Sequence, residues 1–402
     1  MIRQRTMVYL YICLALITLA WPASSARASG FGIFTQGASA LGQANAVVAH
    51  SDGPSAVFFN PALLNRLPGT QVEVGTTLLF PTRDFKSATT GATASTEDVL
   101  YYPSTFYVSH AFNDKISAGL GIFNPFGLGT EWNGSWEGRY IATKSKISTF
   151  NINPVASYQI TPSLSFAAGL DVVFLDASLE RKLFTGGPDL NTKFKGDGTG
   201  LGYNLGLAYD LGHGISLGAS YRSEVDVEVK GNFHIDALLD TGAKSSITLP
   251  RQLMAGVAYQ PNDRLTVETG FRWEDWSSYR QLKLDLDTGG PLPPDIKNWD
   301  DTFAVNIGSK YRLNDTFSLL GGYLYGWNPI PNDTFEPAIP DANTHLFSIG
   351  TQMTFTRLKL AVSYAYQLQE ERIKNNAVGG GIANGTYNAD IHLVGISLGY
   401  HF

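Results

Sequence analysis

Alternating apolar and polar residues recur along most of this chain. In one run, Leu253, Ala255, Val257 and Tyr259 alternate with glutamine, methionine, glycine and alanine. A period of two places one set of side chains on each face of a β-strand. About fourteen such segments occur, each long enough for the roughly 9–11 residues of a tilted membrane-spanning strand. They start near residues 70, 101, 115, 139, 163, 196, 214, 246, 264, 300, 316, 344, 357 and 388.

The connections between these segments alternate in length. Turn-forming residues make short connections at Asn113-Asp114, Thr161-Pro162, 211–214, 261–263 and Asn314-Asp315. Long polar stretches lie between them, at 83–100, 125–138, 183–195, 231–245, 287–299, 328–343 and 371–387. Short turns at one end and long loops at the other are typical of outer-membrane barrels. The sequence therefore predicts an all-β fold, a 14-stranded antiparallel transmembrane β-barrel with both termini in the periplasm.

The last strand supports a closed barrel. Val394, Ile396, Leu398, Tyr400 and Phe402 form one apolar face. In a soluble sheet such an edge would invite aggregation. In a closed barrel it pairs with the first strand, and no edge remains.

The first residues have the pattern of a removed export signal. Arg3 and Arg5 precede an apolar run from Met7 to Ala20, and Ala26-Arg27-Ala28 offers a small-x-small cleavage site. Residues 1–28 are therefore predicted to be a signal peptide. The only cysteine, Cys13, lies within it, which suits an oxidising periplasm.

Composition excludes several classes of protein. Beyond the signal, no apolar stretch approaches the length of a membrane-spanning helix. The net charge of −6 gives no indication of nucleic-acid binding, and the seven histidines show no metal-ligand spacing. We expect no cofactor, no metal and no nucleic-acid partner. The 42 glycines and many aromatic residues fit a membrane barrel, although a soluble β-sandwich would share some of this composition.

Residues 29–66 do not alternate, and they contain apolar residues such as Phe31, Phe34, Phe58 and Phe59. A disordered leader is one interpretation, but apolar content favours burial. A barrel of about fourteen strands is too wide to be filled by its own side chains alone. We therefore predict an N-terminal hatch inside the lumen at residues 29–66, followed by the barrel at residues 67–402.

Several motifs in this order resemble the FadL/TodX-type outer-membrane transporters of long-chain fatty acids and other hydrophobic compounds. They are Ala40-Leu41-Gly42, Asn60-Pro61-Ala62, the run from Tyr221 to Val225, the run from Trp273 to Ser277, and Ile339-Pro340-Asp341. Thr344 departs from the arginine that the family often has there. The terminal aromatic strand also resembles the C-terminal signal of outer-membrane proteins, which implies contact with the barrel-assembly machinery.

The resemblance implies a route for a hydrophobic ligand through an apolar site that basic residues border. Arg181 aligns best with the family's carboxylate-binding position, and Lys297 lies near a second one. Phe31, Phe34, Phe58 and Phe59 would supply apolar contacts from the hatch, which carries the Asn60, Pro61 and Ala62 motif. Arg272, Glu268 and Glu274 are expected to form a charge network inside the barrel.

The resemblance also implies a kink in the third strand that opens the wall sideways. Asn124, Pro125 and Gly127 stand at this place. Proline cannot donate to the ladder and glycine weakens pairing, so these residues would interrupt the wall. The alternative is that the strand ends at Asn124 and a loop begins.

The predicted function is outer-membrane uptake of long-chain fatty acids or similar hydrophobic molecules, by diffusion through the barrel with lateral release. Uptake of aromatic or alkane hydrocarbons is the alternative within the family. A barrel hydrolase using Asp341 and His345, and a purely structural or adhesin barrel, are the rivals from other classes. We expect no enzymatic activity, a monomer, and contact with outer-membrane lipid and lipopolysaccharide.

Overall fold

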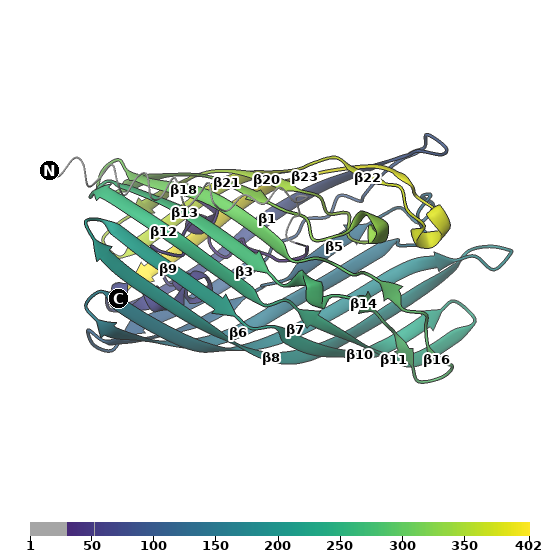
Figure 1. The fold of residues 1–402 in the computed structure, drawn as a ribbon, viewed down its shortest axis with the longest axis horizontal. Coiled ribbons are helices and arrows are strands. Elements are labelled where there is room, and N and C mark those ends of the chain that lie inside the picture. Colours follow the sequence, from purple (N-terminus) through teal and green to yellow (C-terminus); the bar gives the residue numbers. More distant parts are fainter. Residues whose placement is uncertain (1–29, 52) are drawn as a thin grey trace.

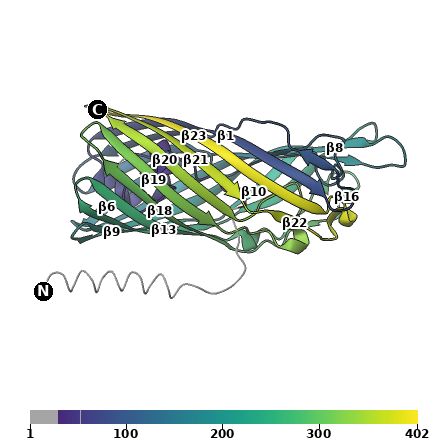
Figure 2. The ribbon, with the colours of Figure 1, turned by 90° about the horizontal axis from the view of Figure 1, so that it is seen from above.

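The computed structural model of the chain describes residues 30–51 and 53–402, which form one closed barrel (Figures 1 and 2). The predicted signal peptide and Cys13 lie outside the described residues. Fourteen antiparallel strands close the wall, which confirms the predicted fold class. The last strand pairs with the first along its whole length, from Gln71 opposite His401 to Ser87 opposite Gly385. No helix within the described residues is long and apolar enough to cross a membrane.

Ten of the fourteen strands are continuous, and four consist of two segments each. The continuous strands are β1 (Thr70–Ser87), β3 (Ser104–Ala111), β6 (Lys144–Thr161), β7 (Leu164–Leu183), β8 (Leu190–Gly212), β13 (Leu265–Glu274), β18 (Thr302–Arg312), β19 (Phe317–Gly326), β20 (Thr344–Thr354) and β23 (Gly385–His401). The divided strands are β4 (Ile116–Phe123) with β5 (Gly127–Glu131), β9 (Ile215–Arg222) with β10 (Val225–Ile235), β11 (Leu239–Leu249) with β12 (Gln252–Asn262), and β21 (Leu358–Gln369) with β22 (Arg372–Lys374).

Short elements decorate the long connections. They are β2 (Thr93–Ser95), β14 (Gln281–Leu282), β15 (Asp285–Leu286), β16 (Gly290–Pro291), β17 (Asp295–Ile296), and the 3-10 turns η2 (Trp276–Ser278), η3 (Asn332–Thr334) and η4 (Val378–Gly381). Together they fold over one end of the barrel, here called the loop end. The opposite end, where the chain finishes, is here called the turn end (Figure 1).

The tight turns lie at the turn end, as predicted. The side chain of Asn113 accepts hydrogen bonds from the backbone N–H groups of Lys115 and Ile116. Asn262 and Asn314 cap their turns in the same way, and Thr161 does so with its hydroxyl. Asn and Thr side chains satisfy the amides that a two-residue reversal leaves unpaired.

Two of the predicted long loops are instead strand hairpins. The β7–β8 connection spans only 184–189 and the β10–β11 connection only 236–238, where loops were predicted at 183–195 and 231–245. The strands continue past the apolar outer belt, so their outer face becomes charged while Phe194, Val229 and Phe233 stay buried inside. In these extensions polar residues on the outer face still alternate with apolar residues on the inner face. The average composition of the two segments is nevertheless as polar as that of a loop, which is why loops were predicted.

Along the membrane-spanning part of the wall, here called the apolar belt, side chains on the outer face are apolar and those on the inner face are polar. Phe271, Phe303 and Ile307 are exposed on the outer face, whereas Glu268 and Glu274 are buried in the lumen. This arrangement is the reverse of a soluble sheet, and it is the one that a lipid surround requires.

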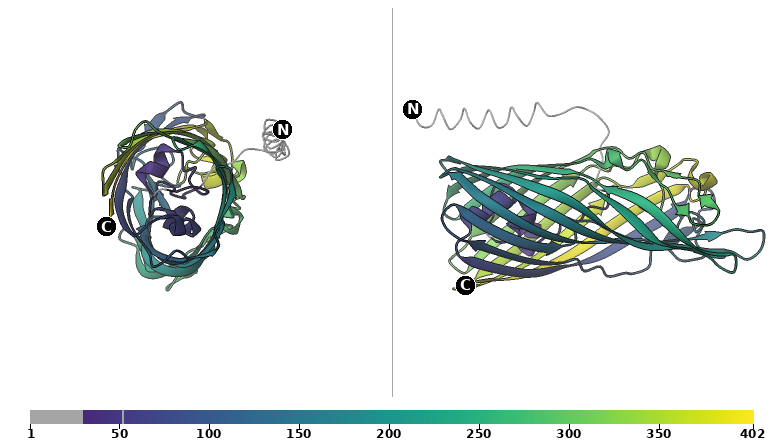
Figure 3. Two further views of the ribbon diagram at one scale, coloured as in Figure 1. Left: turned by 90° about the vertical axis from the view of Figure 1, so that its left-hand side faces the viewer. Right: turned by 90° about the horizontal axis from the view of Figure 1, so that it is seen from below.

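Residues 30–51 and 53–67, here called the plug, lie inside the barrel (Figure 3). They contain α2 (Ala38–Gly42), α3 (Ala56–Phe59) and the 3-10 helix η1 (Pro61–Arg66). The carboxylate of Glu268 on β13 accepts hydrogen bonds from the backbone N–H groups of Val48, Ala49 and His50. A carboxylate that several backbone amides cap holds that stretch of the plug to the wall by charge-assisted bonds.

Asn60 joins the two halves of the plug to the wall. Its side-chain amide donates to the carbonyl oxygens of Val48 at 2.8 Å and Leu207 at 3.0 Å, while its Oδ1 accepts from the backbone N–H of Ala62 at 3.1 Å. Pro61 begins η1, where a missing N–H costs nothing. The Asn60-Pro61-Ala62 motif is therefore a structural clamp that caps η1 and ties it to β8.

Glycines on the lumen face of the wall let the plug backbone come close. A Cβ added at Gly218 would overlap the carbonyl oxygen of Val48, and one at Gly308 would overlap that of Gln43. No other residue fits where two backbones meet at this distance. The glycine-rich composition thus has a specific use in seating the plug.

We predict that Gly218→Val displaces the plug without opening the barrel. Overpacking of this kind costs about 1–3 kcal/mol. The matched control is Gly321→Val, because a Cβ there meets only the Ser309 hydroxyl at 3.9 Å. Both variants should keep the heat-dependent gel mobility of a folded barrel, but only Gly218→Val should expose the plug to added protease. Equal protection of the plug in the two variants would contradict this account of the seat.

Candidate functional site

The wall is interrupted in its third strand. β4 ends at Phe123 and β5 starts at Gly127, and both segments pair with β6. Pro125 has no N–H to donate, and the N–H of Phe126 donates instead to the Thr149 hydroxyl at 2.9 Å. The strand therefore resumes at Gly127 after the interruption and pairs again with β6.

The plug completes the interrupted strand. The backbone N–H of Ile33 donates to the Pro125 carbonyl at 2.8 Å, and the N–H of Gly127 donates to the Phe31 carbonyl at 2.9 Å. Gly32 and Phe126 form an antiparallel bridge between these two bonds. Backbone groups that the break leaves unpaired are thus satisfied by residues of the plug, as buried polar groups must be.

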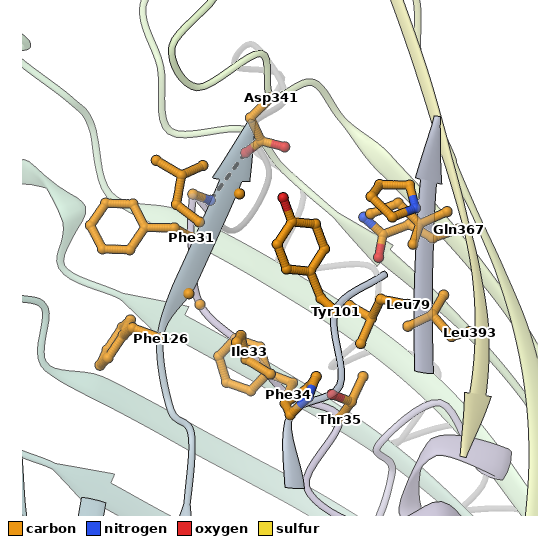
Figure 4. A pocket seen from close by; sticks show the side chains of 18 of the residues that line it. Phe31, Ile33, Phe34, Thr35, Leu79, Tyr101, Phe126, Asp341, Gln367 and Leu393 are labelled. Carbon is orange, nitrogen blue, oxygen red and sulfur yellow. Dashed lines mark hydrogen bonds between the residues drawn. The ribbon is translucent and has the colours of Figure 1, made fainter. Parts of the chain in front are cut away.

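An inner cavity of about 450 Å³ lies between the plug and this break. Figure 4 shows Phe31, Ile33 and Phe34 of the plug facing Leu79 and Leu393 of the wall across it. The same cavity is bordered by Leu100 and Tyr102, which are 46 % and 68 % exposed. The cavity therefore lies between the plug and solvent-accessible residues beside the break.

Phe31 is held by aromatic residues of the loop end. Its ring lies 4.5 Å from that of Trp276 and 5.9 Å from that of Trp299, both edge-on. Phe126 from the break packs at 6.2 Å. Edge-to-face contacts of this kind add specificity to apolar burial, so they fix the start of the plug against both the loops and the broken strand.

The other predicted aromatic residues occupy different places. Phe34 borders the inner cavity under the guanidinium of Arg272, which lies 3.4 Å from its ring centre. Phe58 and Phe59 are fully buried in the plug core and border neither cavity described here. Of the lumen charges, Arg272 pairs with Glu274 at 3.2 Å, whereas Glu268 holds the plug backbone.

Asp341 ties the loop end to the start of the plug. Its carboxylate accepts a hydrogen bond from the Gly30 N–H at 3.1 Å and one from the Gln369 amide at 2.8 Å (Figure 4). Burial raises the pKa of Asp341 to about 7, although hydrogen bonds from Ala342 and Gly30 and the charges of Arg372 and Arg83 act in the opposite direction. His345, in contrast, bonds Tyr323 on the outer face of the wall, so these two residues are not brought together.

An outer cavity of about 400 Å³ lies under the loops and long hairpins. Its walls are mainly apolar and include Phe194, Phe233 and Ile247. Three residues, Leu128, Ile147 and Ile339, border both cavities. The two cavities are therefore neighbours, one leading from the loop end and the other reaching the break.

Arg181 and Lys297 both border the outer cavity, but their charges differ in environment. The ammonium group of Lys297 is buried and pairs with Asp295 at 2.8 Å and with Glu336. Burial alone would lower the pKa of Lys297, but the two carboxylates outweigh it and raise that pKa. Arg181 is exposed and forms no ion pair within the described part of the chain.

Two contributors to the site were not identified from the sequence. Thr149 bonds across the break, and Arg83 borders the inner cavity on the same face of β1 as Pro81 and Phe85. Strand register could have indicated Arg83, because every second residue of β1 faces the lumen. No local pattern distinguishes Thr149 from the other threonines of the barrel.

Together, the apolar outer surface, the plug in the lumen and the cavities beside a wall break define a plugged transmembrane β-barrel with an apolar interior route. The chain belongs to the family described as outer membrane protein transport protein (OMPP1/FadL/TodX), whose model matches residues 19–402. Family membership places it in the outer membrane.

Relatives of similar length cover nearly the whole chain. The long-chain fatty acid transport protein of Escherichia coli (strain K12) is 25% identical, over 89% of this chain and 91% of its own length. Outer membrane protein P1 of Haemophilus influenzae is 24% identical, over 94% and 96%.

Solved structures share the fold. A Pseudomonas aeruginosa FadL homologue superimposes with a TM-score of 0.85 at 19% identity, covering 93% of this chain and 100% of that one. The P. putida toluene transporter TodX gives a TM-score of 0.75 at 20% identity, covering 93% and 99%.

The carboxyl group of Asp341 should make stability depend on pH. Its pKa in the folded protein is raised to about 7 by burial, so the stability it contributes is present below the ordinary aspartate range of about 4 and is lost as the pH rises through about 7. We expect the thermal unfolding temperature to fall between about pH 4 and pH 7, and to fall less in Asp341→Asn, which keeps an oxygen acceptor for Gly30. Parallel pH profiles for the two proteins would show that Asp341 is not the titrating group.

Proposed function

We propose that this protein takes up long-chain fatty acids or similar hydrophobic molecules across the outer membrane by diffusion. The observation that carries the proposal is the pair of adjoining apolar cavities, the inner of which lies where the plug covers a break in the wall. The fatty acid transport activity of the Escherichia coli relative supports the same substrate class.

The route has three stages. A ligand first enters the outer cavity from the loop end, where its carboxylate meets Arg181. It then passes Leu128, Ile147 and Ile339 into the inner cavity, where Phe31 and the segment up to Ile33 must move to admit it. It leaves sideways beside Pro125, because an apolar molecule gains nothing by entering water when lipid is accessible.

Each segment of the chain has its own role in this route. Residues 1–28 direct export, residues 29–66 act as the hatch, and residues 67–402 form the barrel. Both termini lie in the periplasm, because the tight turns of outer-membrane barrels face that side. The protein works as a monomer among outer-membrane lipid and lipopolysaccharide, and its C-terminal strand is read by the barrel-assembly machinery. It has no catalytic role.

Uptake of aromatic or alkane hydrocarbons is the second candidate. The structural likeness to a toluene transporter favours it, and the mostly apolar cavity walls suit either substrate. The two candidates differ in whether a charged head group is recognised. Mass spectrometry of ligand that co-purifies with the protein discriminates between them directly.

Arg181→Ala should weaken binding of a long-chain fatty acid and leave an uncharged alkane nearly unaffected. Loss of a charge-assisted contact costs on the order of 1.5–3 kcal/mol. Lys182→Ala is the matched control, because the neighbouring residue points to the other face and bonds Asn191. Equilibrium binding to the purified protein measures both ligands. Equal losses for acid and alkane would mean that Arg181 acts by packing or that the substrate is neutral.

Restoring the third strand should stop uptake. Replacing Asn124 to Gly127 by alternating valine and threonine supplies the side chains and N–H groups of a continuous strand. The control makes the same replacement at Ser223-Glu224, an interruption between β9 and β10 that borders neither cavity. Cells with the straightened third strand should fold the barrel but take up ligand far more slowly than the control. Normal uptake would rule out the lateral route and direct attention to the Asn60-Pro61-Ala62 clamp.

A further inference from the structure

Two cationic side chains border the inner cavity beside the break. Arg83 lies on β1, on the lumen side, and Lys146 lies on β6 next to the cavity-lining Ile147. Lys146 is exposed, whereas Arg83 is half-buried. Within the described residues neither side chain forms an ion pair, and together they place a positive charge on each side of the wall beside the break.

Arg83 is fixed in place by the resumed third strand. Its Nη1 group donates to the carbonyl oxygen of Gly129 at 2.9 Å, which is its only hydrogen-bond acceptor among the described residues. The Tyr101 ring packs directly on Gly129, where an added Cβ would overlap it. A guanidinium group has five N–H donors, so Arg83 is oriented by one bond and keeps others for a ligand.

The other charges of the inner cavity are already engaged. Arg272 pairs with Glu274 at 3.2 Å and covers Phe34. Among the described residues, Asp341 is the one carboxyl group on the cavity wall, and its oxygens accept hydrogen bonds from Gly30 and Gln369. Tyr101 and Asp341 point toward one another in Figure 4, and both influence Arg83 electrostatically. An anion that enters beside Arg83 therefore meets a donor that no acidic side chain occupies.

We propose that Arg83 is a carboxylate-binding residue of the inner cavity, which holds the head group of a fatty acid beside the break while Lys146 attracts it on the outer side. This inference rests on the proposed function and adds a second carboxylate-binding position, which the ligand reaches after Arg181. A guanidinium can hold a carboxylate with two parallel hydrogen bonds, which a neutral head group cannot reproduce. Arg83 thereby selects acids over hydrocarbons at the point of release.

The test compares two ligands of equal chain length, a long-chain fatty acid and the corresponding fatty alcohol, on the purified full-length protein. Arg83→Gln should lower the affinity for the acid about 10- to 100-fold and change that for the alcohol less than about twofold. Lys195→Gln, which removes an exposed lysine of β8 that borders neither cavity, should change neither affinity. Arg83→Lys keeps the charge but lacks the planar guanidinium group. It should therefore lower the affinity for the acid alone, and by less than Arg83→Gln does.

The outcomes separate this inference from the function on which it rests. Equal losses for acid and alcohol in Arg83→Gln would show that Arg83 only supports Gly129, and an unchanged acid affinity would place the carboxylate elsewhere; either result overturns the inference. If Arg83→Gln does not fold, Arg83→Lys decides by the same comparison. A wild-type protein that binds neither ligand would instead overturn the proposed function.

Discussion

The backbone hydrogen bonds between residues 31–33 and the break at 124–127 are the constraint on which the rest of the site depends. A barrel in lipid cannot leave strand groups unpaired, because no water is present to satisfy them. Pro125 and the divided third strand create such unpaired groups, and the plug supplies the partners. The segment that borders the cavity is therefore also the segment that closes the wall. A movement of this segment changes the cavity and the closure of the wall together.

The remainder of the plug is held firmly, which localises the movement. Glu268 binds three consecutive backbone amides, and Asn60 clamps η1 to Val48 and Leu207. Close backbone contacts at Gly218 and Gly308 add to these polar anchors. Residues 31–33 rest instead on a few aromatic contacts and on the bonds to the broken strand. A ligand of the right shape can compete for those contacts without unfolding the deeper part of the plug.

The barrel was predictable from the sequence because a two-residue period leaves a strong signal in every strand. Tight turns were equally readable, since Asn113, Asn262 and Asn314 each cap a reversal locally. The hairpin extensions were not predicted because their outer face lies beyond the apolar belt and carries lysines instead of apolar residues. These lysines are Lys193, Lys195 and Lys230. Side-chain partners on one strand, such as Arg272 and Glu274, could be predicted, but partners in the loops could not. The burial of Lys297 between Asp295 and Glu336 joins residues whose proximity depends on how the loops fold. The same applies to Thr149, which meets Phe126 only across the break.

Cross-linking the plug to the break tests the central claim most directly. An added Cβ at Gly127 lies 3.5 Å from Cγ1 of Ile33, the side-chain position that a cysteine sulfur would occupy, so a disulfide between cysteines at these two positions is within reach. No other cysteine follows Cys13 in the chain. We predict that Ile33→Cys/Gly127→Cys takes up labelled fatty acid only after reduction, while either single variant is insensitive to reductant. Equal uptake by the oxidised and reduced double variant would contradict the account, because the plug would then not need to leave the wall.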